Sequence, residues 1–263
     1  MIQMTFTAQQ HSVFERLARE LSFALKGLTA EELAAIVLRA AGAAGKETVT
    51  TKLRALADAG KTVSAAAARY AAGGIGNEFR KDSARAAGFI ASMPERARSF
   101  RTAFMKLPRR EQGETLAGAA VFILVFAASA GGADVEGGIP DADIRVTGIG
   151  SHRNIFSHTI LVGLSIEFAA RLAVNILDAA RHRLPAGHHP AWDSIYGYLD
   201  KAKNISIPAM WLGLGAHLIK DSGIFTGGMK PYVGMPVEMP MSAHSAVFAG
   251  NGLLSGLFAK KGS

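Results

Sequence analysis

Apolar residues in the first 110 positions recur at intervals of three or four, the period that places them on one face of an α-helix. In the stretch 11–25, four apolar residues stand four positions apart: Val13, Leu17, Leu21 and Leu25. Further helices are predicted over 28–45, 48–74, 78–93 and 95–107, with Pro94 and Pro108 as boundaries. Strict alternation of apolar and polar residues does not extend over a useful length, so we expect no β-sheet.

Charged residues become scarce after this region. The stretches 115–133, 204–219 and 239–259 contain no Asp, Glu, Lys or Arg. Such runs are typical of membrane-spanning helices, although the buried helices of a soluble all-α protein produce the same pattern. Two of the runs carry His217 and His244, which are unusual residues to face lipid. We therefore predict an all-α helical bundle with apolar helices, at least one of them embedded in a membrane.

The composition and the charge divide the chain into two parts. Of the 263 residues, 49% are hydrophobic and only 19% are charged, which is a low share of charge for a soluble protein. Residues 1–110 contain 18 Lys and Arg against 9 Asp and Glu, whereas residues 111–263 contain 11 against 12. We predict a basic, Ala-rich helical region over 1–110 and an apolar helical domain over 111–263.

The positive charge of the first region predicts a negatively charged partner. An anionic lipid surface fits the apolar second region, whereas nucleic acid has only the charge in its favour, because no recognition motif accompanies it. The first 20 residues lack the basic and then apolar pattern of a cleaved secretory signal. We therefore expect the protein at the inner, or cytoplasmic, membrane.

The absence of cysteine restricts the chemistry that a metal site can use. Without thiolates, a divalent ion must be held by His, Asp and Glu. His217 and Asp221 stand four residues apart, which places both on one helical face. Asp141 and Asp143 follow Pro140 in a predicted turn or extended piece, where side chains two residues apart point the same way.

Two further histidines, His152 and His158, stand six residues apart. Six helical steps separate them by about 240° around the axis, so they cannot share a helix face. We expect His152 in a loop and His158 in the first turns of the helix that follows. One of the two is expected to turn away from a shared site.

Three motifs in this half resemble those of a known family. The segments GGIPDAD, SHRNIFSH and GAHLIKD are similar to successive motifs of the YdjM-like membrane-bound, metal-dependent hydrolases. The resemblance covers about 115–225 and does not extend to 1–110. It implies a metal site formed by six residues, with Arg153 near them: Asp141, Asp143, His152, His158, His217 and Asp221.

These observations favour a metal-dependent hydrolase that uses zinc or manganese. The planar fork of Arg153 suits an anionic oxygen of the substrate, which favours a phosphoester, including that of a lipid. The Gly- and Pro-rich segment after Asp221 is predicted to be a loop over the site, from which His244 or Glu238 would act in catalysis. His244 as an inert helix residue is the alternative.

A non-enzymatic function is the rival interpretation of the whole chain. A helical membrane-binding or pore-type protein would use the basic helices to engage anionic lipid. In that case, the Asp and His residues would form a polar loop without chemistry. Replacement of Asp141 or His217 distinguishes the two functions, because a membrane binder needs neither side chain.

Overall fold

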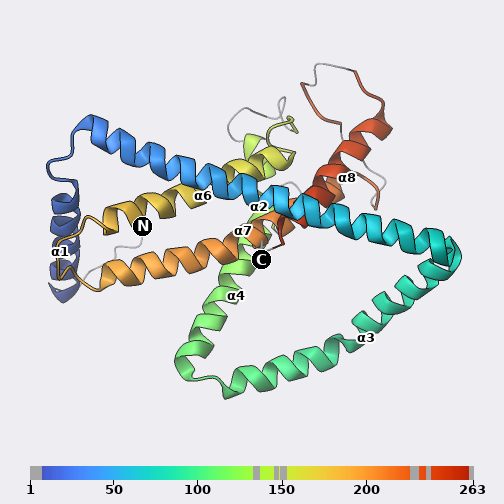
Figure 1. Ribbon diagram of the computed structural model, residues 1–263, viewed down its shortest axis with the longest axis horizontal. Helices are drawn as coiled ribbons and strands as arrows, with labels where there is room; N and C mark the ends of the chain where they lie inside the picture. The colour runs from blue at the N-terminus through green and yellow to red at the C-terminus, as the bar shows by residue number, and fades with distance from the viewer. Residues whose placement is uncertain are drawn as a thin grey trace.

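The computed structural model describes residues 8–132, 137–144, 148, 153–225, 231–234 and 238–260, and in this part the chain is all-α, as predicted. Seven α-helices and one 3-10 turn are present there, and no β-strand. In chain order (Figure 1) they are α1 (Ala8–Leu25), α2 (Ala30–Gly73), α3 (Ile75–Lys106), α4 (Arg109–Ala130), the turn η1 (Pro140–Ala142), α6 (Ile160–Arg181), α7 (Ala191–Asp221) and α8 (Met241–Phe258).

The helices of the first region are longer than predicted. The segments expected as two helices over 28–45 and 48–74 form the single helix α2, which Thr29 and Glu32 cap in a reciprocal pair of hydrogen bonds. Pro94 lies inside α3 instead of ending it. Proline removes one helical hydrogen bond, but this part of α3 is exposed, so water can satisfy the carbonyl that is left.

Helix α7 is the centre of the bundle. It runs parallel to α4, since Lys201 bonds to Glu114 near the start of α4 and Gly213 packs on Phe126 near its end. Helix α6 runs antiparallel to α7, as the pair Arg181–Asp193 indicates. The core side chains of α7 include Trp211, Leu214 and Leu218, all almost completely buried. The uncharged run 204–219 is therefore largely covered by protein.

Two glycines of this core allow helices to approach closely. A side chain at Gly213 would clash with the carbonyl oxygen of Phe126 and with Ser129 on α4. At Gly252 of α8, a Cβ atom would lie 2.7 Å from the side chain of Ile219 and 3.1 Å from the carbonyl oxygen of Gly215 on α7. These contacts hold the last turns of α4 and α7 and the middle of α8 in fixed positions.

A group of charged side chains is buried between α2, α6 and α7. Glu167 is fully buried, and its carboxylate accepts hydrogen bonds from Lys52, Arg171 and the indole of Trp211. The Lys52 amine also bonds to the Phe258 carbonyl oxygen, at 3.0 Å. We call Lys52, Glu167, Arg171 and Trp211 the Glu167 cluster; it joins α2 of the first region to the apolar helices.

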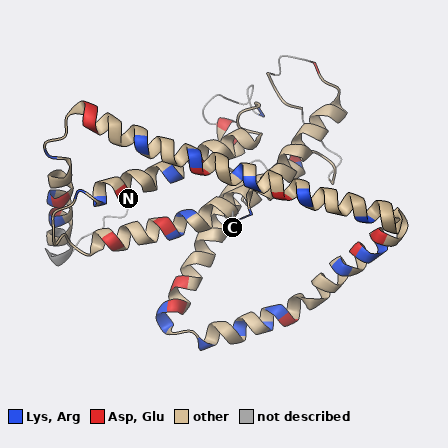
Figure 2. Ribbon diagram, viewed as in Figure 1, with Lys and Arg blue, Asp and Glu red and all other residues tan. Residues whose placement is uncertain are grey.

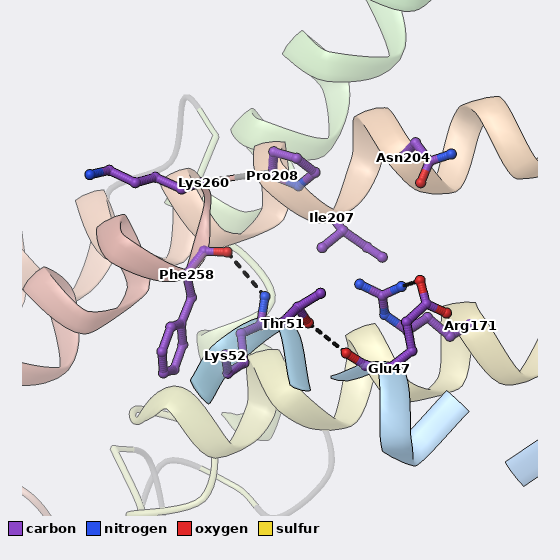
Figure 3. Close-up of a pocket in the computed structure, with 9 residues that line it drawn as sticks. All are labelled: Glu47, Thr51, Lys52, Arg171, Asn204, Ile207, Pro208, Phe258 and Lys260. Atoms are coloured by element: carbon purple, nitrogen blue, oxygen red, sulfur yellow. Dashed lines mark hydrogen bonds and ion pairs between the residues drawn. The ribbon is translucent and has the colours of Figure 1, made fainter. Parts of the chain in front are cut away.

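A cavity of about 370 Å³ lies beside this cluster. Figure 3 shows Lys52 directed at the Phe258 carbonyl and Arg171 paired with Glu47 across the cavity wall. Each of the two buried cations that line the cavity is therefore already paired with a protein carboxylate. This pairing identifies the cluster as part of the framework of the bundle.

Two of the described helices are long and apolar enough to cross a membrane: α4 and α6. Helix α4 contains most of the uncharged run 115–133, and its central turns carry no charge in Figure 2. The uncharged runs 204–219 and 239–259 lie largely in α7 and α8, which are not among the described helices that meet these criteria. Hydropathy alone does not distinguish burial by protein from burial by lipid.

Candidate metal centre

Four atoms of the types that bind metals come together at one end of the bundle. The η1 turn that carries Asp141 is held at the end of α4, since the N–H of Ile139 donates to the carbonyl of Ala128. His158 lies just before α6, while His217 and Asp221 occupy the last turns of α7. The atoms are Asp141 Oδ1, His158 Nε2, His217 Nε2 and Asp221 Oδ2, which we call the His/Asp cluster.

The spacing of these atoms fits a shared metal ion. His158 Nε2 lies 3.1 Å from Asp141 Oδ1 and 3.8 Å from Asp221 Oδ2. His217 Nε2 lies 3.7 Å and 3.4 Å from the same two oxygens. Two ligand atoms that each lie about 2.0–2.1 Å from one tetrahedral ion are separated by about 3.3 Å. Asp141, His158 and His217, whose ligand atoms all lie within 4.8 Å of one another, therefore need only small adjustments to bind one ion, and Asp221 lies beside both histidines.

His217 gives the clearest sign that the cluster is built for a ligand. Its side chain is almost completely buried, and neither Nδ1 nor Nε2 has a hydrogen-bond partner among the described residues. A buried polar atom without a partner costs about 1–3 kcal/mol. A metal ion between His217 and the two carboxylates would remove this cost at Nε2. The donor set of two imidazoles and two carboxylates suits a divalent ion such as zinc or manganese.

A tight turn before α6 places His158. The side chain of Asn154 accepts the backbone N–H groups of Phe156 and Ser157, both at 3.0 Å. The N–H of His158 closes the turn by donating to the carbonyl of Asn154. Thr159 then caps α6 through a hydrogen bond from the N–H of Leu161. The backbone on both sides of His158 is thereby fixed.

Asp143 lies on the opposite edge of the His158 ring. Its Oδ2 is 3.7 Å from His158 Nδ1 and 2.5 Å from Ser157 Oγ, which in turn is 2.9 Å from Nδ1. Asn154 also donates to this carboxylate, at 3.1 Å. A carboxylate on Nδ1 favours the tautomer in which Nδ1 carries the proton and Nε2 is free to bind a metal. In this geometry, Asp143 orients the ligand instead of binding the ion.

Burial and neighbouring charges set the protonation of two residues of the cluster, His158 and Asp221. Burial lowers the pKa of His158, and this effect outweighs the nearby carboxylates, so the ring is neutral at neutral pH. Burial alone would raise the pKa of Asp221, but the adjacent His217 and Arg153 lower it to about 2. Asp221 is therefore ionised at every physiological pH, so a neutral His158 ring faces a negative carboxylate.

Arg153 lies at the edge of the cluster. Its Nε is 3.4 Å from Asp221 Oδ2, so the guanidinium is next to the prospective ligands without being one of them. The backbone of Arg153 has a φ of 64°, a left-handed conformation that is rare outside glycine and is enriched at functional sites. Its carbonyl accepts the N–H of Val233, which ties the segment 231–234 to this position.

Tyr232 connects the same segment to His158. Its hydroxyl donates to the His158 carbonyl at 2.6 Å, and its ring stacks on Phe248 of α8. Burial raises the pKa of Tyr232, so the hydroxyl keeps its proton. His244 accepts the N–H of Tyr232 through Nδ1. His244, which was predicted to be catalytic, is therefore connected to His158 through Tyr232. Glu238, the other residue predicted to act in catalysis, is exposed.

Several predicted details differ from the structure. His152 lies outside the described residues, so its relation to His158 stays a prediction. His158 precedes α6 by two residues instead of lying in its first turns. Asp141 and Asp143 do not point to the same place, because the segment forms a 3-10 turn and not an extended strand. Ser157, Asn154 and Tyr232 were not predicted; the adjacency of Ser157 to His158 was the only signal in the sequence.

Comparison with known proteins adds no information about this site. No protein-family model, curated protein or solved structure matches the chain. The case for a metal centre therefore rests on the buried group of Asp141, His158 and His217, whose ligand atoms all lie within 4.8 Å of one another.

Proposed function

We propose that the protein is a metal-dependent hydrolase of phosphoesters that acts at a membrane. The observation that carries the proposal is the position of His217, whose buried Nε2 has no hydrogen bond to any described residue and faces the carboxylates of Asp141 and Asp221. These three residues and His158 would hold a zinc or manganese ion. When bound, such an ion lowers the pKa of a water molecule and polarises a phosphoryl oxygen.

The protein residues around the cluster have separate tasks in this proposal. Asp143 and Ser157 hold the His158 ring in the tautomer that leaves Nε2 free. Arg153, which is 3.4 Å from Asp221, is placed to hold an anionic oxygen of the substrate next to the reacting centre. Tyr232 fixes the His158 backbone and covers the site from the side of α8.

The apolar helices favour a substrate at a membrane. Helices α4 and α6 are long and apolar enough to cross a bilayer, and both have an end at the His/Asp cluster. A site at the end of such helices would lie near the level of lipid headgroups, where phosphoesters are abundant. We therefore infer a lipid phosphoester as the substrate class. The resemblance to the YdjM-like hydrolases points to the same chemistry and remains a prediction.

Metal-dependent hydrolysis by the purified full-length protein tests this function. The chain is treated with a chelator and reloaded with zinc or manganese, and hydrolysis of p-nitrophenyl phosphate, bis-p-nitrophenyl phosphate and phosphatidic acid is measured. We expect activity that returns only with metal and disappears in Asp141→Asn. The matched control is Asp58→Asn, which changes an exposed carboxylate of α2. Equal rates for the two variants, or no metal-dependent hydrolysis, would contradict the proposal.

The non-enzymatic alternative makes a different prediction for the same variants. If the chain were only a membrane-binding or pore-type protein, Asp141→Asn would leave its lipid association and its conductance unchanged, and no phosphoester would be hydrolysed. Nucleic-acid binding by 1–110 would instead appear as salt-dependent retention of DNA or RNA, equally strong in both variants.

A further inference from the structure

Helix α3 carries an apolar stripe along its length, interrupted by Asp82, which falls within the same arc. Apolar residues follow one another at steps of three, four or seven, so at 100° per residue they fall within about 80° of arc. This α3 stripe consists of Ile75, Phe79, Ala86, Ile90, Met93, Ala97, Phe100 and Phe104. An amphipathic helix of this kind normally buries its apolar face against another surface.

The protein itself does not cover the α3 stripe. Phe79, Ile90 and Phe100 are 65%, 66% and 64% exposed. Helix α3 is attached to the body near its start, where Arg69 and Tyr70 of α2 bond to Asp82. From the protruding end of α2 it runs to the start of α4, apart from the other helices along its length (Figure 1). The stripe is therefore available to a partner along about nine turns.

Basic residues flank the stripe on both sides. Helix α3 contains seven Lys and Arg against three Asp and Glu, and Figure 2 shows the basic residues spread along its length. At 100° per residue, Arg85 and Arg96 lie about 60–80° from Met93 on one side, and Arg101 lies about 80° away on the other. The Arg96 guanidinium lies 4.9 Å above the Phe89 ring.

The acidic residues of α3 do little to offset this charge. Asp82 is paired with Arg69 and Arg85, and Glu78 is paired with Lys81. These two residues lie in the first turns, next to α2, and the third, Glu95, lies about 160° from Met93 on the face opposite the stripe. The middle and the end of the helix therefore present arginines beside an apolar surface. Helices that combine an apolar face with flanking basic residues lie in the interface of anionic membranes.

We infer that α3 lies flat on an anionic lipid surface, with the α3 stripe among the acyl chains and the flanking arginines at the lipid phosphates. The length of an arginine side chain allows its guanidinium to reach the headgroups from beside a buried stripe. Only Leu107 and Pro108 separate α3 from α4, a helix able to cross a membrane. A bilayer that holds α4 would therefore hold the end of α3 near its surface.

A second copy of the chain is a poorer occupant for this face. Two α3 stripes packed together would bring the arginines beside each stripe close to those of the other copy, and like charges repel. An anionic membrane supplies the opposite charge along the full length of the helix. Each basic residue near such a surface strengthens binding. The inference does not depend on the His/Asp cluster.

The absence of cysteine permits a direct test in the full-length chain. Ile90→Cys, in the α3 stripe, and Ala91→Cys, on the exposed opposite side, are each labelled with an environment-sensitive fluorophore. The labelled proteins are reconstituted into phosphatidylcholine vesicles with or without phosphatidylglycerol. Quenching by acrylamide, a neutral solute, then reports the access of water to each label. Circular dichroism confirms that the two variants have the same helix content.

We expect the label at position 90 to be quenched several-fold less than the label at position 91 in phosphatidylglycerol vesicles. The protection should be weaker in pure phosphatidylcholine, and weaker again when Arg96→Glu and Arg101→Glu are added. Equal quenching at the two positions in anionic vesicles would overturn the inference. So would equal protection in both lipids, or protection without lipid that grows with protein concentration, which would indicate a second copy.

Discussion

Two groups of ionisable side chains are buried in this bundle, and they differ in how their polar atoms are paired. In the Glu167 cluster, a single carboxylate accepts bonds from a lysine, an arginine and an indole. In the His/Asp cluster, two carboxylates face two imidazoles, and the ring of His217 has no hydrogen bond within the described residues. The charged atoms of the first group are paired with one another, whereas the second could bind a cation.

The comparison shows that burial of charge alone does not identify a functional site. Both clusters are buried, and both join helices that are far apart in sequence. The difference lies in the balance of donors and acceptors, because in the His/Asp cluster the buried ring nitrogens of His217 have no hydrogen-bond partner among the described residues. Substitutions that remove one partner from either cluster therefore test this difference in pairing.

The largest effect is expected for Glu167→Gln. Loss of the central charge leaves Lys52 and Arg171 buried without their main partner, which costs about 3–5 kcal/mol. Chemical denaturation of the detergent-solubilised protein measures this loss of unfolding free energy. The matched control Glu47→Gln removes a half-exposed carboxylate that also pairs with Arg171, and we expect about 1 kcal/mol or less. If Glu167→Gln lost as little unfolding free energy as Glu47→Gln, the Glu167 cluster would contribute little to stability.

His217→Leu should affect stability only when metal is present. In the metal-free protein, the change replaces buried polar atoms without partners by an apolar side chain, so we expect little loss of stability. Zinc at about 100 times its dissociation constant should stabilise the wild type by about 2.7 kcal/mol and the variant not at all. Thermal unfolding with zinc and with a chelator measures both quantities. A large loss of stability in the chelated variant would show that His217 is a framework residue.

Asp143→Asn tests whether this residue orients His158 instead of binding the ion. Asparagine lacks the charge that favours a proton on Nδ1, so metal affinity should fall by about 10–100-fold without being abolished. Competition with a chelating dye gives the dissociation constant. If Asp143→Asn abolished binding as completely as Asp141→Asn, Asp143 would be a direct ligand.

The smallest effect is expected for Ser157→Ala. It removes one hydroxyl between Asp143 and His158, and metal affinity should weaken by about 0.5–1.5 kcal/mol. Ser165→Ala is the matched control, since its hydroxyl bonds only to the Leu161 carbonyl within α6 in the contacts described, and the same titration should show no change.

The sequence predicts local relations well and long-range ones poorly. The all-α class follows from helical periodicity, and the shared face of His217 and Asp221 follows from their spacing of four. The side on which Asp143 meets His158 depends on a 3-10 turn that the spacing of two residues did not reveal. The pairing of Lys52 with Glu167, more than 100 residues away, is set by the packing of α2 on α6, which no local pattern encodes.

The environment of the apolar runs is a second feature that the local sequence does not predict. Both 115–133 and 204–219 lack charge, but α4 is left largely uncovered by the protein whereas α7 forms its core. The composition of the two runs is similar because protein and lipid interiors select similar side chains. Only the arrangement of the helices separates the two environments.

The metal content of the purified full-length protein tests the central claim most directly. After loading with zinc or manganese and removal of excess ion, elemental analysis gives the number of ions per chain for the wild type, His217→Leu and His182→Leu. His182 is an exposed histidine at the end of α6 and serves as the matched control. The account predicts one tightly bound ion in the wild type and in His182→Leu, and none in His217→Leu. No bound ion in the wild type, or the same content in both histidine variants, would contradict it.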